Sequence, residues 1–177
     1  CAVCATGRTQ LCPTKRLIGL DQNQGAFAEF TVIAARNVLP LSDRVSDAVA
    51  CLIEPLACAV HLLALAAVPP LSPAVLFGGG TLGAMTLVVA RRLGYQVTVV
   101  EPSPGRRAMA LALGASAALD PSDDVLAATG GPVPLTIDCT GVAPARQAAV
   151  RVARPGGTVL LLGTTDLDTA LDWRDVG

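Results

Sequence analysis

The chain has 177 residues, of which 52% are hydrophobic and 15% charged, and its formal net charge is −1. This composition predicts one folded domain, or one domain with part of a second, and argues against intrinsic disorder. The near-zero charge and the 3% aromatic content argue against a nucleic-acid surface. No uninterrupted apolar run reaches the roughly 18 residues that a membrane span needs. We therefore expect neither nucleic acid nor a membrane as a partner.

Six cysteines fall into two groups. Cys1, Cys4 and Cys12 lie in the opening stretch "CAVCATGRTQLC", where closely spaced thiolates suit a tetrahedral zinc ion; the alternative is three exposed thiols without metal. The others, Cys51, Cys58 and Cys139, lie singly in apolar runs. Isolated thiols are typical of a reducing compartment and not of a disulfide framework, so we expect a cytoplasmic protein.

The first part of the chain predicts a loop segment, strands and helices. Residues 1–24 are polar and rich in turn formers, whereas residues 25–41, "GAFAEFTVIAARNVLPL", alternate and predict one or two strands. Residues 42–68 predict a long helix or a helix pair, with Ser42 or Ser46 as the N-cap and a kink or break at Pro55.

From Pro73 onward, short apolar strands alternate with helices. We expect strands at 73–78, 96–101, 116–120, 134–141 and 156–163, with helices at 81–94, 103–114, 122–130 and 143–153. Strict alternation of apolar strands with helices predicts a parallel sheet covered on both faces. The expected fold class is therefore α/β, a Rossmann-type doubly wound parallel sheet of about five strands.

A glycine-rich turn follows the first of these strands. Gly78, Gly80 and Gly83 form G-x-G-x-x-G, and Glu101 ends the next strand 21 positions after Gly80. Gly78 permits the tight turn, Gly80 lets a pyrophosphate approach the backbone, and Gly83 lets the helix pack closely on the strand. The free N–H groups at the helix start, at Thr81 and Leu82, would face the phosphates. The alternative is a glycine turn that packs a strand on a helix and binds no ligand.

The acidic residue at the end of the second strand suggests which dinucleotide binds. Glu101 could accept hydrogen bonds from both ribose hydroxyls and would repel a 2′-phosphate, which favours NAD over NADP. Arg106 and Arg107 follow closely, and they could either cover the adenine or recruit a 2′-phosphate.

Several motifs together resemble the zinc-dependent medium-chain dehydrogenase/reductase family, in its alcohol, polyol and threonine dehydrogenase group. They are "GAFAEF", "EPLACAVH", the glycine turn, "DCTG" and "RPGGTVLLLG", and they extend over nearly the whole chain. The resemblance implies an NAD-binding Rossmann-type domain at 71–177, incomplete at its C-terminus. It also implies that 1–70 is a β-rich remnant of the GroES-like catalytic domain, with part of a structural-zinc lobe and a linking helix.

The resemblance also implies site residues. Cys1, Cys4 and Cys12 match three of the four ligands of a C-x2-C-x2-C-x7-C zinc lobe. Glu54 of "EPLACAVH" matches an acidic residue at or near the catalytic zinc, so it is the candidate catalytic and metal residue. Thr140, Gly141 and Gly163, at the ends of the fourth and fifth strands, would lie along the cofactor, as would Arg106. His61 matches no ligand, and we expect His61, Cys51 and Cys58 to be packed helix residues.

The implied function is oxidation of a secondary alcohol or polyol by hydride transfer to NAD, with structural and catalytic zinc in the full-length enzyme. The resemblance further implies a homo-oligomer, and a chain that is inactive alone because upstream zinc ligands lie outside it. Two alternatives remain open. One is a non-catalytic NAD-binding module or degenerate short copy; the other is a zinc-free reductase that uses NADPH.

Overall fold

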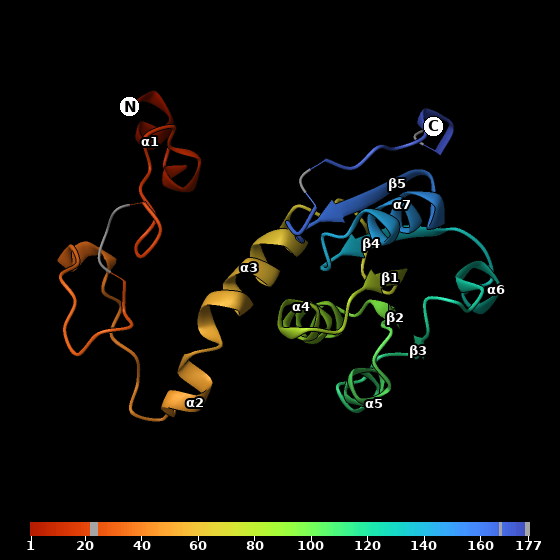
Figure 1. Ribbon diagram of the computed structural model, residues 1–177, viewed down its shortest axis with the longest axis horizontal. Helices are drawn as coiled ribbons and strands as arrows, with labels where there is room; N and C mark the ends of the chain where they lie inside the picture. Colours follow the sequence, from red (N-terminus) through yellow and green to blue (C-terminus); the bar gives the residue numbers. More distant parts are fainter. Residues whose placement is uncertain (22–24, 167, 176–177) are drawn as a thin grey trace. The chain divides into compact units, whose positions relative to one another are not determined.

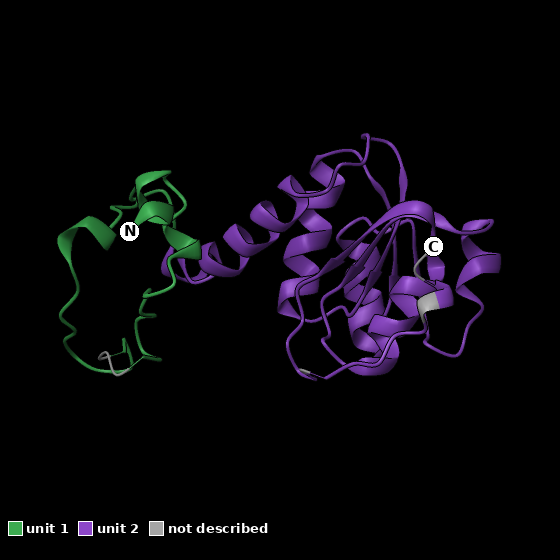
Figure 2. Cartoon of the chain, turned by 90° about the horizontal axis from the view of Figure 1, so that it is seen from above, with its two compact units in different colours: residues 1–45 green, residues 46–177 purple. Residues whose placement is uncertain are grey.

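The structure is a computed structural model that describes residues 1–21, 25–166 and 168–175. The last residues of the predicted polar opening, 22–24, and residues 167, 176 and 177 of the tail lie outside the described part. The chain divides into two compact units, residues 1–45 and 46–177 (Figure 2). The predicted domain boundary at 70/71 stays a prediction.

The first unit contains only short helical turns among its described residues. They are α1 (Ala2–Ala5) and the 3-10 turns η1 (Thr9–Leu11) and η2 (Ala35–Asn37). The prediction of one or two strands at 25–41 is wrong, because the structure has none there. A strand needs a neighbour for its backbone N–H and C=O groups, and an apolar face needs something to cover it. Phe27, Phe30 and Val32 are instead strongly exposed.

The second unit begins with the helix pair that the sequence predicts. It consists of α2 (Asp47–Ala50) and α3 (Ile53–Ala64), and Ser46 is the N-cap of α2. The break falls at residues 51–52 and not at Pro55, which lies in the first turn of α3. A proline in the first turn loses no intrahelical hydrogen bond, so it starts this helix without breaking it. Ala59, Leu62 and Leu63 are the buried residues of α3.

Five parallel strands form the expected sheet. They are β1 (Pro73–Phe77), β2 (Gln96–Val100), β3 (Ala117–Leu119), β4 (Val133–Asp138) and β5 (Ala153–Leu161), in the order β3-β2-β1-β4-β5. Phe77 at the end of β1 pairs with Val100 of β2 and with Asp138 of β4. The strand order reverses between β1 and β4, and open α/β sheets bind ligands at such a switch point.

Helices cover both faces of this sheet. They are α4 (Thr81–Arg92), α5 (Pro104–Ala112), α6 (Val125–Thr129) and α7 (Ala143–Val152), followed by the 3-10 turn η3 (Trp173–Asp175). Helices α4 and α5 lie on one side, and α6 and α7 on the other (Figure 1). Successive residues of β1 alternate between two cores: Ala74 and Leu76 join the cluster of α3, α4 and α5, whereas Val75 and Phe77 join that of α7. The predicted doubly wound α/β fold is confirmed.

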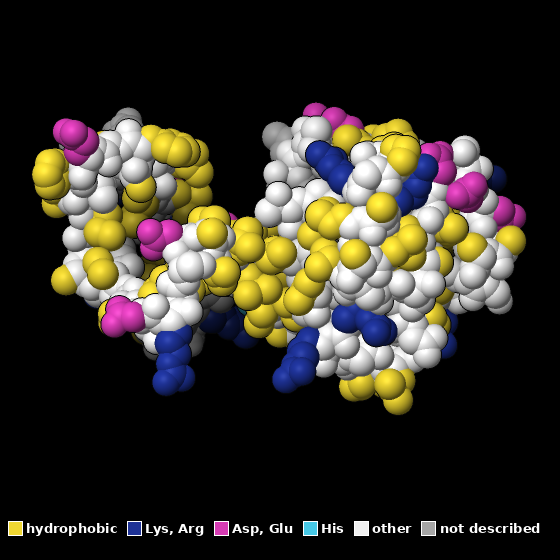
Figure 3. Space-filling view, turned by 90° about the horizontal axis from the view of Figure 1, so that it is seen from below, with side chains coloured by type: hydrophobic (Ala, Val, Ile, Leu, Met, Phe, Trp, Pro, Cys, Tyr) yellow, Lys and Arg dark blue, Asp and Glu magenta, His cyan; other side chains and the backbone are white. Residues whose placement is uncertain are grey.

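The surface carries scattered charges and exposed apolar side chains. On the face drawn in Figure 3, positive and negative side chains are interspersed, without a broad field of one sign.

One stretch, Asp47–Ala64, is apolar and long enough to cross a membrane by length and composition alone. It is split into two helices, and the core helix of a soluble protein passes the same test, so this is weak evidence for a membrane.

Candidate dinucleotide site and cysteine cluster

A cavity of about 680 Å³ opens at the carboxyl ends of β1, β2 and β4. This volume is in the range of small-molecule and cofactor sites. Five predicted cofactor residues line it: Gly78, Gly80, Glu101, Arg106 and, from the loop after β4, Thr140. Most of the remaining lining is apolar and comes from α6, α7 and the strand ends. The cavity therefore combines an apolar wall with a few polar groups at the switch point.

The three glycines of the turn have three different structural roles. A Cβ on Gly83 would lie 1.9 Å from the carbonyl oxygen of Gly78, so only glycine lets α4 approach the end of β1 this closely. Gly78 has a φ of +96°, which favours glycine, and a Cβ there would meet the Thr140 side chain at 2.7 Å. Nothing lies within 4 Å of a Cβ on Gly80, which lines the cavity. Gly80 is thus the position where the backbone is open to a ligand.

The N-terminus of α4 begins at this open position. Gly80 is the N-cap and offers no side chain to the first turn. The N–H groups of the first helical residues, including Thr81 and Leu82, have no intrahelical acceptors, and the helix dipole adds partial positive charge there. Such a terminus suits the phosphates of a dinucleotide.

Glu101 connects the end of β2 to the glycine turn. Its side chain is only 4% exposed. Oε2 accepts a hydrogen bond from the Gly79 N–H at 2.7 Å, and Oε1 accepts one from the Ser103 N–H at 2.9 Å. Each carboxylate oxygen can accept a second hydrogen bond, so ribose hydroxyls remain possible donors. The sequence pattern gave no sign that Glu101 also holds the turn in place.

The two arginines after β2 are in different environments. Arg107 donates through Nη1 to the Glu101 and Pro102 carbonyl oxygens and to Asp120 Oδ2, at 2.7–2.8 Å. Arg107 therefore fixes the loop, and it does not line the cavity. The Arg106 side chain is 59% exposed, lines the cavity, and has its Nη1 3.9 Å from Glu101 Oε1. Arg106 alone keeps both roles that the sequence left open.

The loops after β4 and β5 pack backbone against backbone. Asp138 accepts hydrogen bonds from the Thr140 N–H at 2.8 Å, the Thr140 hydroxyl at 2.6 Å and the Gly141 N–H at 3.1 Å. A Cβ on Gly163 would lie 1.9 Å from the Gly141 nitrogen. Gly163 is not among the cavity-lining residues, so the structure explains this glycine by loop packing.

Cys139 lines the cavity as a half-buried thiol. Burial raises its pKa to about 11, so the thiol stays neutral at physiological pH and becomes nucleophilic only as the pH approaches that value. At pH 8 its thiolate fraction is on the order of 10⁻³, against about a quarter for an ordinary thiol. We expect iodoacetamide to alkylate Cys139 at least about 50-fold more slowly than exposed Cys51, as measured by peptide mass spectrometry. Comparable rates at pH 8 would show that this wall of the cavity opens readily.

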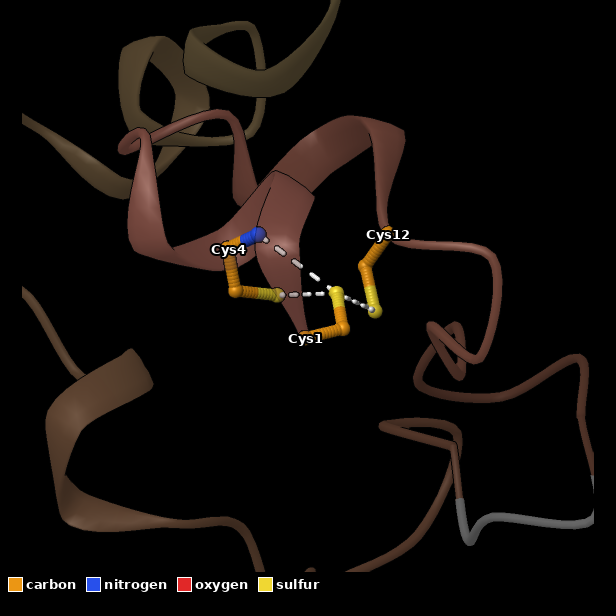
Figure 4. Close-up of side chains that lie close together, drawn as sticks. All are labelled: Cys1, Cys4 and Cys12. Carbon is orange, nitrogen blue, oxygen red and sulfur yellow. Dashed lines mark hydrogen bonds between the residues drawn. The ribbon is translucent and has the colours of Figure 1, made fainter.

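The opening cysteines converge on one point (Figure 4). The Cys1 Sγ lies 3.5 Å from the Cys4 Sγ and 3.8 Å from the Cys12 Sγ, and all three sulfurs lie within 4.8 Å of one another. Zn–S bonds of about 2.3 Å in a tetrahedron separate the sulfurs by about 3.8 Å, so these three thiols fit the corners of a zinc site. No other group of three metal-binding side chains occurs in the described part of the chain.

Two cysteines of this cluster, Cys4 and Cys12, differ in pKa because they make different hydrogen bonds. Hydrogen bonding to the Thr14 hydroxyl and backbone lowers the pKa of Cys12, and the hydrogen bond to Cys12 raises the pKa of Cys4. Cys12 therefore deprotonates before Cys4, which makes it the better metal ligand of these two.

Glu54 has no metal-binding neighbours beyond one thiol. It is exposed in the first turn of α3, where its Oε1 accepts a hydrogen bond from the Cys58 Sγ at 3.5 Å. Burial raises the pKa of Cys58, and the hydrogen bond to the Glu54 carboxylate raises it further. Two ligands cannot hold a catalytic zinc, so the described residues do not form that site. The expectation of packed helix residues is wrong for Cys51 and His61, which are both exposed, whereas Cys58 is half-buried.

Comparison with known proteins identifies the family. The sequence model described as "Zinc-binding dehydrogenase" matches residues 81–177, more than half of the chain. The chain belongs to the zinc-binding dehydrogenase family. This confirms the resemblance read from the motifs.

Individual relatives agree with this assignment. The chain is 34% identical to L-galactonate-5-dehydrogenase of Escherichia coli K12, over 92% of this chain and 49% of that protein. It is 31% identical to L-threonine 3-dehydrogenase of Rhizobium rhizogenes, over 99% and 52%. A crystal structure of a zinc-binding dehydrogenase from Sinorhizobium meliloti 1021, bound to NADP, superposes with a TM-score of 0.88 at 30% identity, covering 99% of this chain and 54% of that one. The chain thus spans about half the length of the relatives that it matches.

Proposed function

We propose that this chain binds a nicotinamide dinucleotide in the cavity at the switch point, as the nucleotide-binding part of an alcohol-oxidising dehydrogenase. The observation that carries this proposal is the combination of an open Gly80, an uncapped helix N-terminus and a buried Glu101 around one cavity. The family and the NADP in the S. meliloti structure support the class of ligand. The apolar wall would cover the adenine, and the α4 N-terminus would face the pyrophosphate.

The proposed reaction is removal of hydride from a secondary alcohol or polyol. The dinucleotide supplies the hydride acceptor, and this chain's residues bind and orient it. The names of the relatives, dehydrogenases of L-galactonate and L-threonine, support a substrate with a secondary hydroxyl group. Glu54 remains the candidate acidic residue near a catalytic zinc, but the described residues do not complete such a site, so we derive no step through that metal.

We also propose that Cys1, Cys4 and Cys12 bind a structural zinc ion. The sulfur spacing supports this role, and the C-x2-C and C-x7-C intervals suit a metal-holding loop. Such a site would order the first unit, which has little buried apolar surface of its own. A cytoplasmic location and a homo-oligomeric enzyme remain predictions from the sequence.

Dinucleotide selectivity gives the test of the proposed function. We expect NADH to bind more tightly than NADPH to the unmodified chain, as measured by calorimetry or NADH fluorescence. Changing Glu101→Ser should reduce the NADH-to-NADPH preference by about 10- to 100-fold, because hydrogen bonds to a carboxylate contribute about 1.5–3 kcal/mol. Glu101→Gln, which keeps one carbonyl oxygen for the Gly79 N–H, should fall between these two.

The control for charge is Glu29→Ser, because Glu29 is an exposed carboxylate of the first unit. It should leave both affinities unchanged. Tighter binding of NADPH by the unmodified chain would reverse the assignment of NAD, in line with the NADP in the S. meliloti structure. Failure to bind either dinucleotide would refute the proposed function.

A second candidate function is a non-catalytic dinucleotide-binding module. The observation that favours it is the lack of a second cluster of metal ligands among the described residues. Both candidates predict NADH binding, and turnover separates them. A module would show no NADH formation with secondary alcohols and zinc, even when combined with the rest of a full-length dehydrogenase.

A further inference from the structure

Arg146 of α7 is a buried cation that the proposed function does not use. The residue is 8% exposed, and its side chain lies beneath the loops that follow β4 and β5. The motif "DCTGVAPARQ" marks the first of these loops but gave no reason to single out this arginine. A buried guanidinium needs acceptors for most of its five N–H groups, so its partners define its role.

The guanidinium joins the two loops through their backbones. Nη2 donates to the Gly141 carbonyl oxygen at 3.2 Å and to the Gly163 carbonyl oxygen at 3.0 Å. Nη1 donates to the Asp166 carbonyl oxygen at 2.8 Å and to the Thr169 hydroxyl at 2.6 Å. One side chain therefore holds the loop after β4 and the segment after β5 in one arrangement.

The charge of this arginine has a buried partner at the end of β4. Arg146 Nε lies 3.5 Å from Oδ2 of Asp138, a fully buried carboxylate that also organises Thr140 and Gly141. The Nε itself makes no hydrogen bond. The pair thus neutralises two buried charges, whereas the hydrogen bonds of Nη1 and Nη2 set the positions of the loops.

A further hydrogen-bond network shows how tightly the loops depend on each other. The Asp166 N–H donates to the Gly141 carbonyl oxygen at 2.7 Å, and Asp166 Oδ2 accepts from the Ala143 N–H at 2.7 Å. The backbones of Gly141 and Gly163 touch so closely that neither position has room for a side chain. Two loops in such contact can move only together.

These loops lie on the β4–β5 side of the switch point. Glu101, at the end of β2, lies on the opposite side, where the adenosine ribose is placed in the proposed function. A dinucleotide that crosses the carboxyl edge extends its nicotinamide half toward β4 and β5. We infer that Arg146 is a positioning residue that sets the nicotinamide side of the site through Gly141 and Gly163. This inference rests on the proposed function.

The test compares the whole dinucleotide with its adenosine half. Arg146→Lys keeps the positive charge beside Asp138. The single ammonium group of lysine cannot hydrogen-bond to the acceptors of both loops at once, as the planar guanidinium does. We expect the Kd of NADH to rise at least about fivefold in this variant, and that of AMP to change less than about twofold. A loss of folding alone would weaken both ligands equally.

Two further variants keep the test decisive. Thr169→Val removes one acceptor of Nη1 and should show the same pattern more weakly. Arg154→Met, at an exposed arginine of β5, should change neither Kd. Amide hydrogen exchange gives a readout without ligand, because the Asp166 N–H should exchange faster in Arg146→Lys than in the unmodified chain.

Each outcome separates the inference from the proposed function. NADH affinity that is unchanged, or that falls in parallel with AMP affinity, in both Arg146→Lys and the milder Thr169→Val would overturn the inference alone. Absence of NADH binding by the unmodified chain would overturn the proposed function and the inference together.

Discussion

Replacing Gly83 with alanine should destabilise the second unit by about 3 kcal/mol or more, because a Cβ there would collide with the Gly78 carbonyl. The new carbon would lie 1.9 Å from the Gly78 carbonyl oxygen and 2.9 Å from its carbonyl carbon, which are both backbone atoms, and α4 cannot withdraw without leaving its core. Thermal denaturation followed by circular dichroism should show a Tm lower by about 6–12 °C. Binding of NADH should be lost with the fold.

Gly80→Ala is the matched control in the same turn. Nothing lies within 4 Å of the new Cβ, and the φ of −70° suits alanine. The cost in stability should stay below about 1 kcal/mol, mainly from a poorer N-cap. The methyl group would occupy the space through which a pyrophosphate approaches, so NADH affinity should fall at least about tenfold without unfolding. Equal Tm values for the two variants, or unchanged NADH binding in Gly80→Ala, would refute these roles.

Adding a fourth cysteine should convert the opening cluster into a tight zinc site. Extension of the chain by Cys-Gly-His before Cys1 places a thiol three positions upstream and completes C-x2-C-x2-C-x7-C. A closed four-ligand site holds structural zinc far more tightly than three thiolates with one open position. We expect zinc affinity to increase at least about 100-fold, measured by competition with a chromophoric chelator at pH 7.5.

Thiol labelling distinguishes a real site from an accidental spacing. In the zinc-loaded extended chain, Cys1, Cys4 and Cys12 should resist alkylation, while exposed Cys51 reacts and serves as the internal control. Affinity should fall as the pH drops, because each ligand must lose its proton before it binds. Cys12, whose pKa is lowered, should keep its metal-binding thiolate to a lower pH than Cys4, whose pKa is raised. Reactive cluster thiols in the zinc-loaded form would mean that the sulfurs do not share a metal.

The sequence by itself determined the doubly wound sheet, its helices and the place of the glycine turn. Strands β1, β2 and β4 are short, apolar and bounded by turn residues, and they bury almost all of their residues. Such a pattern has one common solution, in which helices cover both faces. The helix ends followed from local chemistry as well: Gly94 and Gly114 end α4 and α5 with φ values of +92° and +95°.

The tertiary structure alone decided which residues share a site. Contacts between distant segments assigned Gly163 to loop packing, gave Glu101 a second role at Gly79, and placed Arg146 beneath both loops. The same dependence explains the wrong expectation of strands at 25–41. The periodicity of a sequence indicates which side chains prefer to be buried. A strand also requires a neighbouring backbone to pair with, and a site requires groups that only the folded chain brings together.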